Sequence, residues 1–193
     1  MKIARSALLL VALPASLAAQ QPPAGATANP ITTALRGRIL ALHRNLAQAF
    51  DSIPEAKFTY KPTPAQQSIG YIAQHLISDN TLFCNAFGEM KATVSPADAA
   101  APDTVRAKWP RADLIAKLKE SFAFCERAMG QLDDAKLAEQ TTVTFGNGQS
   151  RTVYRANMAV GHALDLADHY SQIANYMRLN GMLPPTALPR PRP

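Results

Sequence analysis

Four polar residues near the C-terminus follow one another at steps that place them on one face of a helix. They are His162, Asp165, His169 and Gln172, separated by three, four and three residues. At 100° per residue, such steps keep side chains on one side of a helix. Asp165 and His169 lie about 6 Å apart along the axis, so one metal ion can contact both. The pattern therefore indicates metal binding or metal-centred chemistry.

A second helical segment, SIGYIAQHLISDN, offers another imidazole, that of His75. Helical bundles build metal sites from His and carboxylate groups that facing helices direct inward. We therefore expect His75, Asp165 and His169 to hold one ion. His162 lies about 10.5 Å before His169 along the helix, too far to share that ion easily, and is predicted to be a neighbour of the site or an alternative ligand. Gln172 is expected to orient His169 or a bound water.

Two histidines and one carboxylate with open coordination positions suit Zn(II), and also Fe(II), Ni(II) or Mn(II). A second interpretation is that the polar face of this helix is solvated. The opposite face carries Ala159, Leu166, Ile173 and Met177, which could form the buried stripe instead. On that interpretation His75 would be a packed histidine beside apolar residues and not a ligand.

Amphipathic periodicity predicts four helices, at about residues 32–52, 68–87, 110–132 and 154–179. Residues 139–153 alternate around a Gly-Asn-Gly sequence, which predicts a short hairpin before the last helix. Four amphipathic helices in one domain predict an all-α fold, a four-helix bundle with a hairpin-like insertion.

Two other segments carry specific expectations. In the first helix the apolar stripe contains Leu35, Ile39, Leu42, Leu46 and Phe50. His43 falls beside this stripe, so we expect it to be exposed. Residues 91–109 are rich in small residues and proline, which predicts a long loop that is either functional or a slack connection.

The N-terminal residues have the pattern of a secretory signal peptide. Lys2 and Arg5 precede an apolar run, and small residues follow it. The run is too short to span a bilayer. We divide the chain into a signal peptide at 1–19, a flexible leader at 20–30, the bundle at 31–185 and a Pro-rich tail at 186–193. We expect the mature protein to be periplasmic or secreted, without a membrane span.

The charge of the chain is moderate and scattered. There are 20 Lys and Arg residues against 14 Asp and Glu residues, and Lys2 and Arg5 belong to the predicted signal peptide. Nucleic acid is not an expected partner, because basic residues do not gather in a block interleaved with aromatics. A small-molecule ligand is the expected partner, and a homodimer is compatible with the sequence.

The chain has two cysteines, Cys84 and Cys125. In an exported protein an even number of cysteines predicts a disulfide. Such a bond would close a loop of about 40 residues, which the chain-entropy model values at roughly 4 kcal/mol of stability. The alternative, a catalytic thiol, has less support because no histidine lies near either cysteine in the sequence.

Three blocks of sequence carry a family resemblance. They are YKPTP at residues 60–64, SIGYIAQHL at residues 68–76 together with Asn80, and DHYSQ at residues 168–172 followed by YMRLNGMLPP at residues 176–185. In order and spacing they are similar to the DinB-like family, also called the DinB/YfiT superfamily. The resemblance covers about residues 32–185.

This resemblance implies an up-down-down-up four-helix bundle that holds a divalent ion, often zinc or nickel, on three histidines. One histidine comes from the second helix and two from the last helix, four residues apart. His75 and His169 match the first and last positions, but Asp165 stands where the family usually has histidine. That departure implies either a changed metal preference or a degenerate site. The expected cofactor is Zn or Ni, with Fe or Mn as alternatives.

Better-understood members of the family resemble thiol-dependent transferases, isomerases and hydrolases. The predicted export would place this chain where low-molecular-weight thiols are scarce. No serine-hydrolase elbow, P-loop or dinucleotide-binding motif is present in the sequence. We therefore favour a metal-dependent hydrolase, with no catalytic residue identified beyond the ligands. The alternative is a non-catalytic exported bundle with a degenerate metal site, which binds a ligand or a partner.

Overall fold

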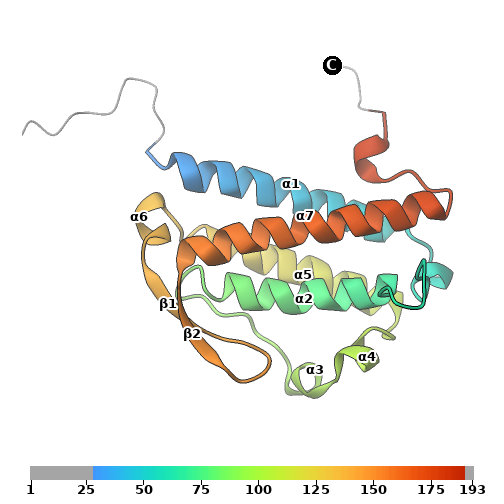
Figure 1. The fold of residues 1–193 in the computed structure, drawn as a ribbon, viewed down its shortest axis with the longest axis horizontal. Helices are drawn as coiled ribbons and strands as arrows, with labels where there is room; N and C mark the ends of the chain where they lie inside the picture. The colour runs from blue at the N-terminus through green and yellow to red at the C-terminus, as the bar shows by residue number, and fades with distance from the viewer. Residues whose placement is uncertain (1–27, 190–193) are drawn as a thin grey trace, which may run out of the picture.

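The computed structural model describes residues 28–189, and within them the chain is mainly helical (Figure 1). The long helices are α1 (Pro30–Ser52), α2 (Ile69–Cys84), α5 (Arg111–Met129) and α7 (Arg155–Leu179). The predicted all-α class is confirmed. The predicted signal peptide at 1–19, most of the leader at 20–30 and the end of the tail at 186–193 lie outside the described residues.

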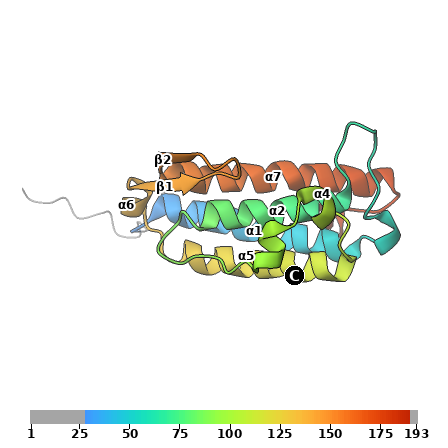
Figure 2. The same ribbon diagram turned by 90° about the horizontal axis from the view of Figure 1, so that it is seen from below.

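The long helices surround one core. α1 packs against α5 and α7, and α2 packs against the same two helices. Following the colours in Figures 1 and 2, α1 and α7 run in one direction, and α2 and α5 run in the other. Neighbouring α2 and α7 are therefore antiparallel. The core contains fully buried residues from all four helices, among them Ile39, Leu46, Phe50, Ile72, Leu76, Leu114, Leu118, Leu166 and Ile173.

The ends of α2 have identifiable causes. At its start the side-chain oxygen of Ser68 accepts a hydrogen bond from the backbone N–H of Tyr71, at 3.2 Å, which is an N-cap. The helix ends at Cys84, three residues before the predicted end. The N–H groups of Ala86 and Phe87 bond to carbonyls only three residues back, so the last turns tighten and leave the α-helix.

The segment predicted as a loop at residues 91–109 contains two short helices, α3 (Pro96–Ala100) and α4 (Asp103–Arg106). The side chain of Ser95 caps α3 by accepting from the N–H of Asp98. α4 lies against the start of α2. A Cβ atom at Gly70 would collide with the carbonyl oxygen of Ala107, so glycine is what permits this close approach.

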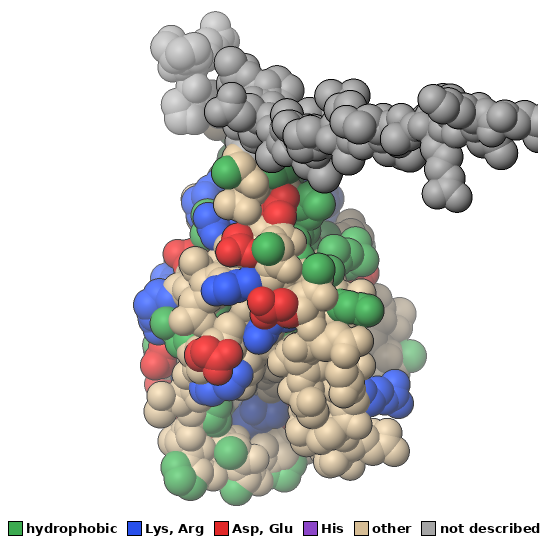
Figure 3. Space-filling model, turned by 90° about the vertical axis from the view of Figure 1, so that its left-hand side faces the viewer, with side chains coloured by type: hydrophobic (Ala, Val, Ile, Leu, Met, Phe, Trp, Pro, Cys, Tyr) green, Lys and Arg blue, Asp and Glu red, His purple; other side chains and the backbone are tan. Residues whose placement is uncertain are grey.

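The predicted hairpin is confirmed. Strands β1 (Gln140–Thr144) and β2 (Ser150–Tyr154) pair antiparallel, with Thr142 opposite Thr152. The hairpin and the short helix α6 (Asp134–Leu137) lie at the end of the molecule where α7 begins. Basic and acidic side chains are interspersed on the face at that end, without one dominant basic patch (Figure 3). Within the described residues, no helix has both the length and the apolar character to cross a membrane.

The expectation that His43 is exposed was wrong, since its side chain is only 2% accessible. Its ring stacks on that of Phe122 of α5, with centroids 4.4 Å apart. The reason is its spacing, because His43 lies four residues after Ile39 and three before Leu46. It therefore belongs to the buried stripe itself and not to its border.

Candidate metal centre

Four side chains from two helices converge beside the core. His75 and Asp79 come from α2, and Asp165 and His169 come from α7. Each offers one ligand atom, and these atoms all lie within 4.8 Å of one another. The structure thus brings together His75, Asp165 and His169, which the sequence predicted as ligands, and adds Asp79, which it did not.

The antiparallel course of α2 and α7 explains how the four residues meet. On α2 the histidine precedes the aspartate by four residues, and on α7 the aspartate precedes the histidine by four. Antiparallel helices then place histidine level with histidine and aspartate level with aspartate. The rings of His75 and His169 indeed meet edge to face, with centroids 4.9 Å apart.

Each histidine also contacts the aspartate of its own helix. The Nε2 atom of His75 lies 3.1 Å from Oδ2 of Asp79, and Nε2 of His169 lies 3.3 Å from Oδ1 of Asp165. Both Nε2 atoms therefore face the centre of the cluster. A residue pair four apart on a helix can reach one point in this way, as a shared ion requires.

The electrostatics of the cluster favour a bound cation. Burial and the nearby charge of Asp165 raise the pKa of Asp79 to about 7. Burial and the neighbouring His169 lower the pKa of His75. Burial opposes the charged form of His169, but the hydrogen bond and charge of Asp165 outweigh it and raise the pKa of His169. The carboxyl groups of Asp79 and Asp165 are thus held close together, and a divalent ion bound between them would relieve their electrostatic repulsion.

The residues present fit a divalent ion. The Oδ2 atom of Asp165 is buried and accepts no hydrogen bond from an amide, hydroxyl or cationic donor in the described part of the chain; the carboxyl of Asp79 can donate to Asp165 only when it is protonated. Such an atom is costly unless something binds it. Imidazole nitrogen and carboxylate oxygen together suit first-row divalent metals, and two carboxylates balance the charge of one such ion.

Gln172 lies where it can orient His169. Its Oε1 atom is 3.3 Å from Nδ1 of His169, and its Nε2 donates to Oδ2 of Asp168 at 3.0 Å. Asp168 thereby fixes the orientation of the amide, so that the amide oxygen faces the imidazole. With Nδ1–H donating to that oxygen, the proton that Nε2 of His169 shares with Asp165 is the one that a metal would replace.

Helix α4 borders the cluster on one side. The ring of Tyr71 stacks near His75, with centroids 6.2 Å apart, and Tyr71 also interacts with Asp103 of α4. The side chains of His75 and Asp79 remain 32% and 19% accessible, respectively. The cluster is therefore partly accessible to solvent on the side of α2.

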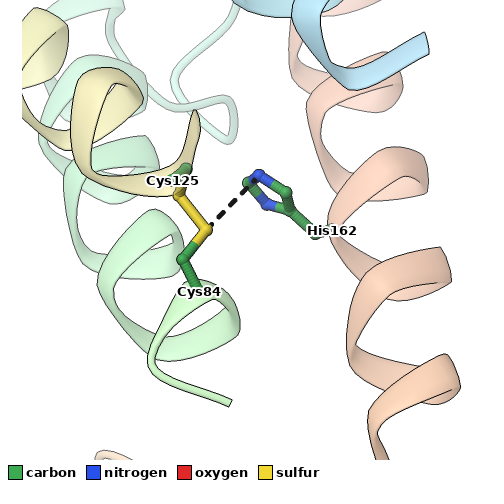
Figure 4. A group of neighbouring side chains, drawn as sticks. All are labelled: Cys84, Cys125 and His162. Carbon is green, nitrogen blue, oxygen red and sulfur yellow. Dashed lines mark hydrogen bonds between the residues drawn. A yellow bond between two sulfur atoms is a disulfide. The ribbon is translucent and has the colours of Figure 1, made fainter. Parts of the chain in front are cut away.

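His162 belongs to a different group. Its Nε2 atom lies 3.7 Å from Sγ of Cys84, and Cys84 forms the predicted disulfide with Cys125 (Figure 4). The side chain is fully buried. His162 lies three residues before Asp165 on α7. Because α2 and α7 are antiparallel, this places His162 level with Cys84 at the C-terminal end of α2 and away from His75.

Asp79 is the site residue that the sequence reasoning missed. Its signal was the four-residue step after His75, which mirrors the step from Asp165 to His169. Either step alone is common on solvated helices. Only the antiparallel pairing of the two helices makes the mirrored order meaningful.

The fold and the cluster together define a helical protein with a candidate metal centre between two antiparallel helices. The sequence model of the DinB superfamily matches residues 38–173, more than half of the chain. The protein therefore belongs to the DinB superfamily. None of the curated proteins matches this sequence.

Solved structures share this fold. A DinB-like protein from Bacillus cereus aligns with a TM-score of 0.60 at 14% identity, over 79% of this chain and 95% of that one. A conserved protein from Enterococcus faecalis aligns with a TM-score of 0.56 at 16% identity, over 77% and 96% of the two chains. The mycothiol-dependent maleylpyruvate isomerase aligns with a TM-score of 0.58 at 14% identity, over 74% of this chain. This chain spans only 60% of that enzyme's length.

Proposed function

We propose that this protein is an exported metal-dependent hydrolase that binds one divalent ion on His75, Asp79, Asp165 and His169. The observation that carries the proposal is the convergence of four ligand atoms within 4.8 Å, two from each of two facing helices. The buried Oδ2 of Asp165, which lacks a donor whenever Asp79 is ionised, supports it. We take Zn or Ni as the ion, with Fe or Mn as alternatives, because imidazole and carboxylate ligands accept all four.

The chain's own residues supply binding, orientation and access. A divalent ion held by these four residues would supply Lewis acidity, which would lower the pKa of a bound water. His75 and His169 present Nε2 to the centre, and Asp165 and Asp79 present their carboxyl groups beside each other. Gln172 holds His169 in its orientation. The partly accessible side of His75 and Asp79 is the approach for a substrate.

Hydrolysis is preferred over thiol transfer because of the predicted signal peptide. One structural neighbour is named as a mycothiol-dependent enzyme, and that dependence belongs to the neighbour. An exported protein meets few low-molecular-weight thiols, whereas water is available everywhere. The predicted signal peptide therefore favours water as the nucleophile.

A cavity supports a second candidate function, the binding of a small molecule without catalysis. It has a volume of about 370 Å³ and lies between α2, α5 and the segment that contains α3 and α4. This size suits a small organic ligand. Its lining includes Trp109 and Phe124, which suit an aromatic or apolar ligand. The charged residues of the lining are of both signs, and Lys117 pairs with Asp98 and Arg106 with Asp103.

The test of metal binding is elemental analysis of protein purified from a periplasmic extract without an affinity metal. We expect close to one metal per chain in the wild type and a large loss in Asp165→Ala and His169→Ala. Asp113→Ala, an exposed aspartate on α5, is the matched control and should keep the metal. A wild type that contains no metal, and takes up none of the four ions on reconstitution, would refute the proposal.

The test of catalysis follows on the loaded protein. We would compare hydrolysis of ester, amide and phosphoester substrates by the wild type and His169→Ala. Metal-dependent turnover that disappears in His169→Ala supports the hydrolase. Metal binding without turnover, together with saturable binding of small aromatic ligands that Trp109→Ala weakens, supports the binding function instead.

A further inference from the structure

A second cluster of potential ligands lies in the core, separate from the first. Cys84 of α2, Cys125 of α5 and His162 of α7 each offer one ligand atom, and these atoms lie within 4.8 Å of one another. All three residues are 0% accessible. Figure 4 shows the imidazole of His162 reaching from α7 toward the disulfide that joins α2 and α5.

The environment of His162 is poorly suited to an imidazole as it stands. The rings of Phe83 and Phe87 lie beside it, with centroids 5.5 and 5.9 Å away. Its Nδ1 atom has no hydrogen-bond partner in the described residues, and its Nε2 faces only a sulfur of the disulfide, a weak acceptor. Burial lowers the pKa of His162 to about 4, so the ring is neutral and its nitrogen lone pair is available.

His43 adds a fourth polar group to the same place. Its ring meets that of His162 edge to face, with centroids 5.7 Å apart. Neither of its nitrogens has a hydrogen-bond partner among the described residues. Two buried imidazoles and two sulfurs thus share an otherwise apolar core. Burying the imidazoles costs free energy, and while the disulfide is intact almost no hydrogen bonds offset that cost.

We infer that reduction of the Cys84–Cys125 disulfide converts this cluster into a buried zinc site with Cys84, Cys125 and His162 as ligands. A protein dithiol, the class of reductant left where low-molecular-weight thiols are scarce, supplies two electrons; the S–S bond breaks, two thiols form, and the reductant becomes a disulfide. Zinc then replaces the two thiol protons, which leave to solvent. The two thiolates balance the charge of the ion, so the dry core carries no net charge.

The geometry requires little movement of His162. Tetrahedral zinc with Zn–S of about 2.3 Å and Zn–N of about 2.0 Å places sulfur and nitrogen about 3.5 Å apart. The separation between Sγ of Cys84 and Nε2 of His162 is already 3.7 Å. The two sulfurs must separate as the bond breaks. His43 lies beside His162 but is not among the converging ligand atoms, and it can become the fourth donor of a structural zinc site only when its ring leaves Phe122.

The test uses Co(II) as an optical substitute for zinc, on the full chain, oxidised or reduced with a phosphine. Thiolate ligation gives Co(II) an intense charge-transfer absorption that imidazole and carboxylate ligation lack. We would compare the wild type with His162→Leu, which keeps both cysteines, and with Met158→Leu, a matched buried change on α7. The double variant His75→Ala, His169→Ala removes the first site.

We expect the reduced wild type to bind one more Co(II) than the oxidised protein, with thiolate absorption. Met158→Leu and the double variant should keep that absorption, and His162→Leu should bind the extra ion at least about tenfold more weakly. Three results would overturn the inference: no thiolate absorption in the reduced wild type, equal affinity in His162→Leu, or loss of the absorption in the double variant. Unfolding on reduction that zinc does not reverse would overturn it as well.

Discussion

Replacement of His43 by phenylalanine should make the protein less sensitive to acid. The His43 ring is 2% accessible, stacks on Phe122 and has no hydrogen-bond partner for either nitrogen among the described residues. Burial, and to a lesser degree the neighbouring His162, lower the pKa of His43 to about 3. Glu126 of α5 is the acidic group that faces it, with Oε1 3.7 Å from Nδ1.

The sign and size of the effect follow from linkage. The pKa of His43 in the folded state lies below its ordinary value of 6.5. Its contribution to stability is therefore complete above pH 6.5 and is lost as the pH falls toward 3. Between pH 7.5 and 5.5 the unfolded chain gains almost one proton on this residue and the folded chain gains none. The unfolding free energy of the wild type should therefore fall by about 1.4 kcal/mol over this range because of His43.

The assay is urea denaturation of the wild type and His43→Phe at pH 7.5 and 5.5, with a chelator present. Other groups also titrate in this range, and the raised pKa of Asp79 acts in the opposite direction. Their effects are common to both proteins and cancel in the difference. Between pH 7.5 and 5.5 the unfolding free energy of the variant should rise by about 1.4 kcal/mol relative to that of the wild type. A constant difference, or one that shifts toward the wild type, would show instead that His43 charges and pairs with Glu126.

Three further changes have defined outcomes. Gln172→Ala should weaken metal binding about 10- to 100-fold in a competition titration with a chromophoric chelator, and unchanged affinity would contradict its orienting role. Gly70→Val should drive the carbonyl of Ala107 away, so amide exchange in α4 should accelerate, and unaltered protection would be evidence against the close approach. Replacing Cys84 and Cys125 by serine should lower the unfolding free energy by about 4 kcal/mol in urea titrations, and a stability equal to that of the wild type would contradict the cross-link's role.

The long helices were predictable because each carries a continuous apolar stripe and ends at a proline, a glycine or a tight turn. The hairpin was predictable from its Gly-Asn-Gly turn. The short helices α3 and α4 were not, since each has only one turn and owes its place to packing against longer helices. Their position depends on Gly70, whose lack of a side chain matters only once Ala107 lies opposite it.

The site was predictable in part. The spacing of Asp165 and His169 identified a face of α7, and the resemblance to the DinB-like family linked that face to His75. Asp79 and the separate location of His162 were not foreseen. Periodicity along one helix shows which residues share a face, but it says nothing of how far a neighbouring helix is shifted along its axis.

That axial shift is what makes two clusters out of one polar face. Along the interface of α2 and α7, His75 meets His169, Asp79 lies level with Asp165, and Cys84 meets His162. From His75 to Cys84 is nine residues, and from His162 to His169 is seven, which are similar lengths of helix. A shift of one turn, about 5.4 Å, would separate all three pairs together. The three contacts thus fix one register of α2 against α7. In this register His162 lies at a different position along the helix axis from His75 and His169, so it does not share an ion with them.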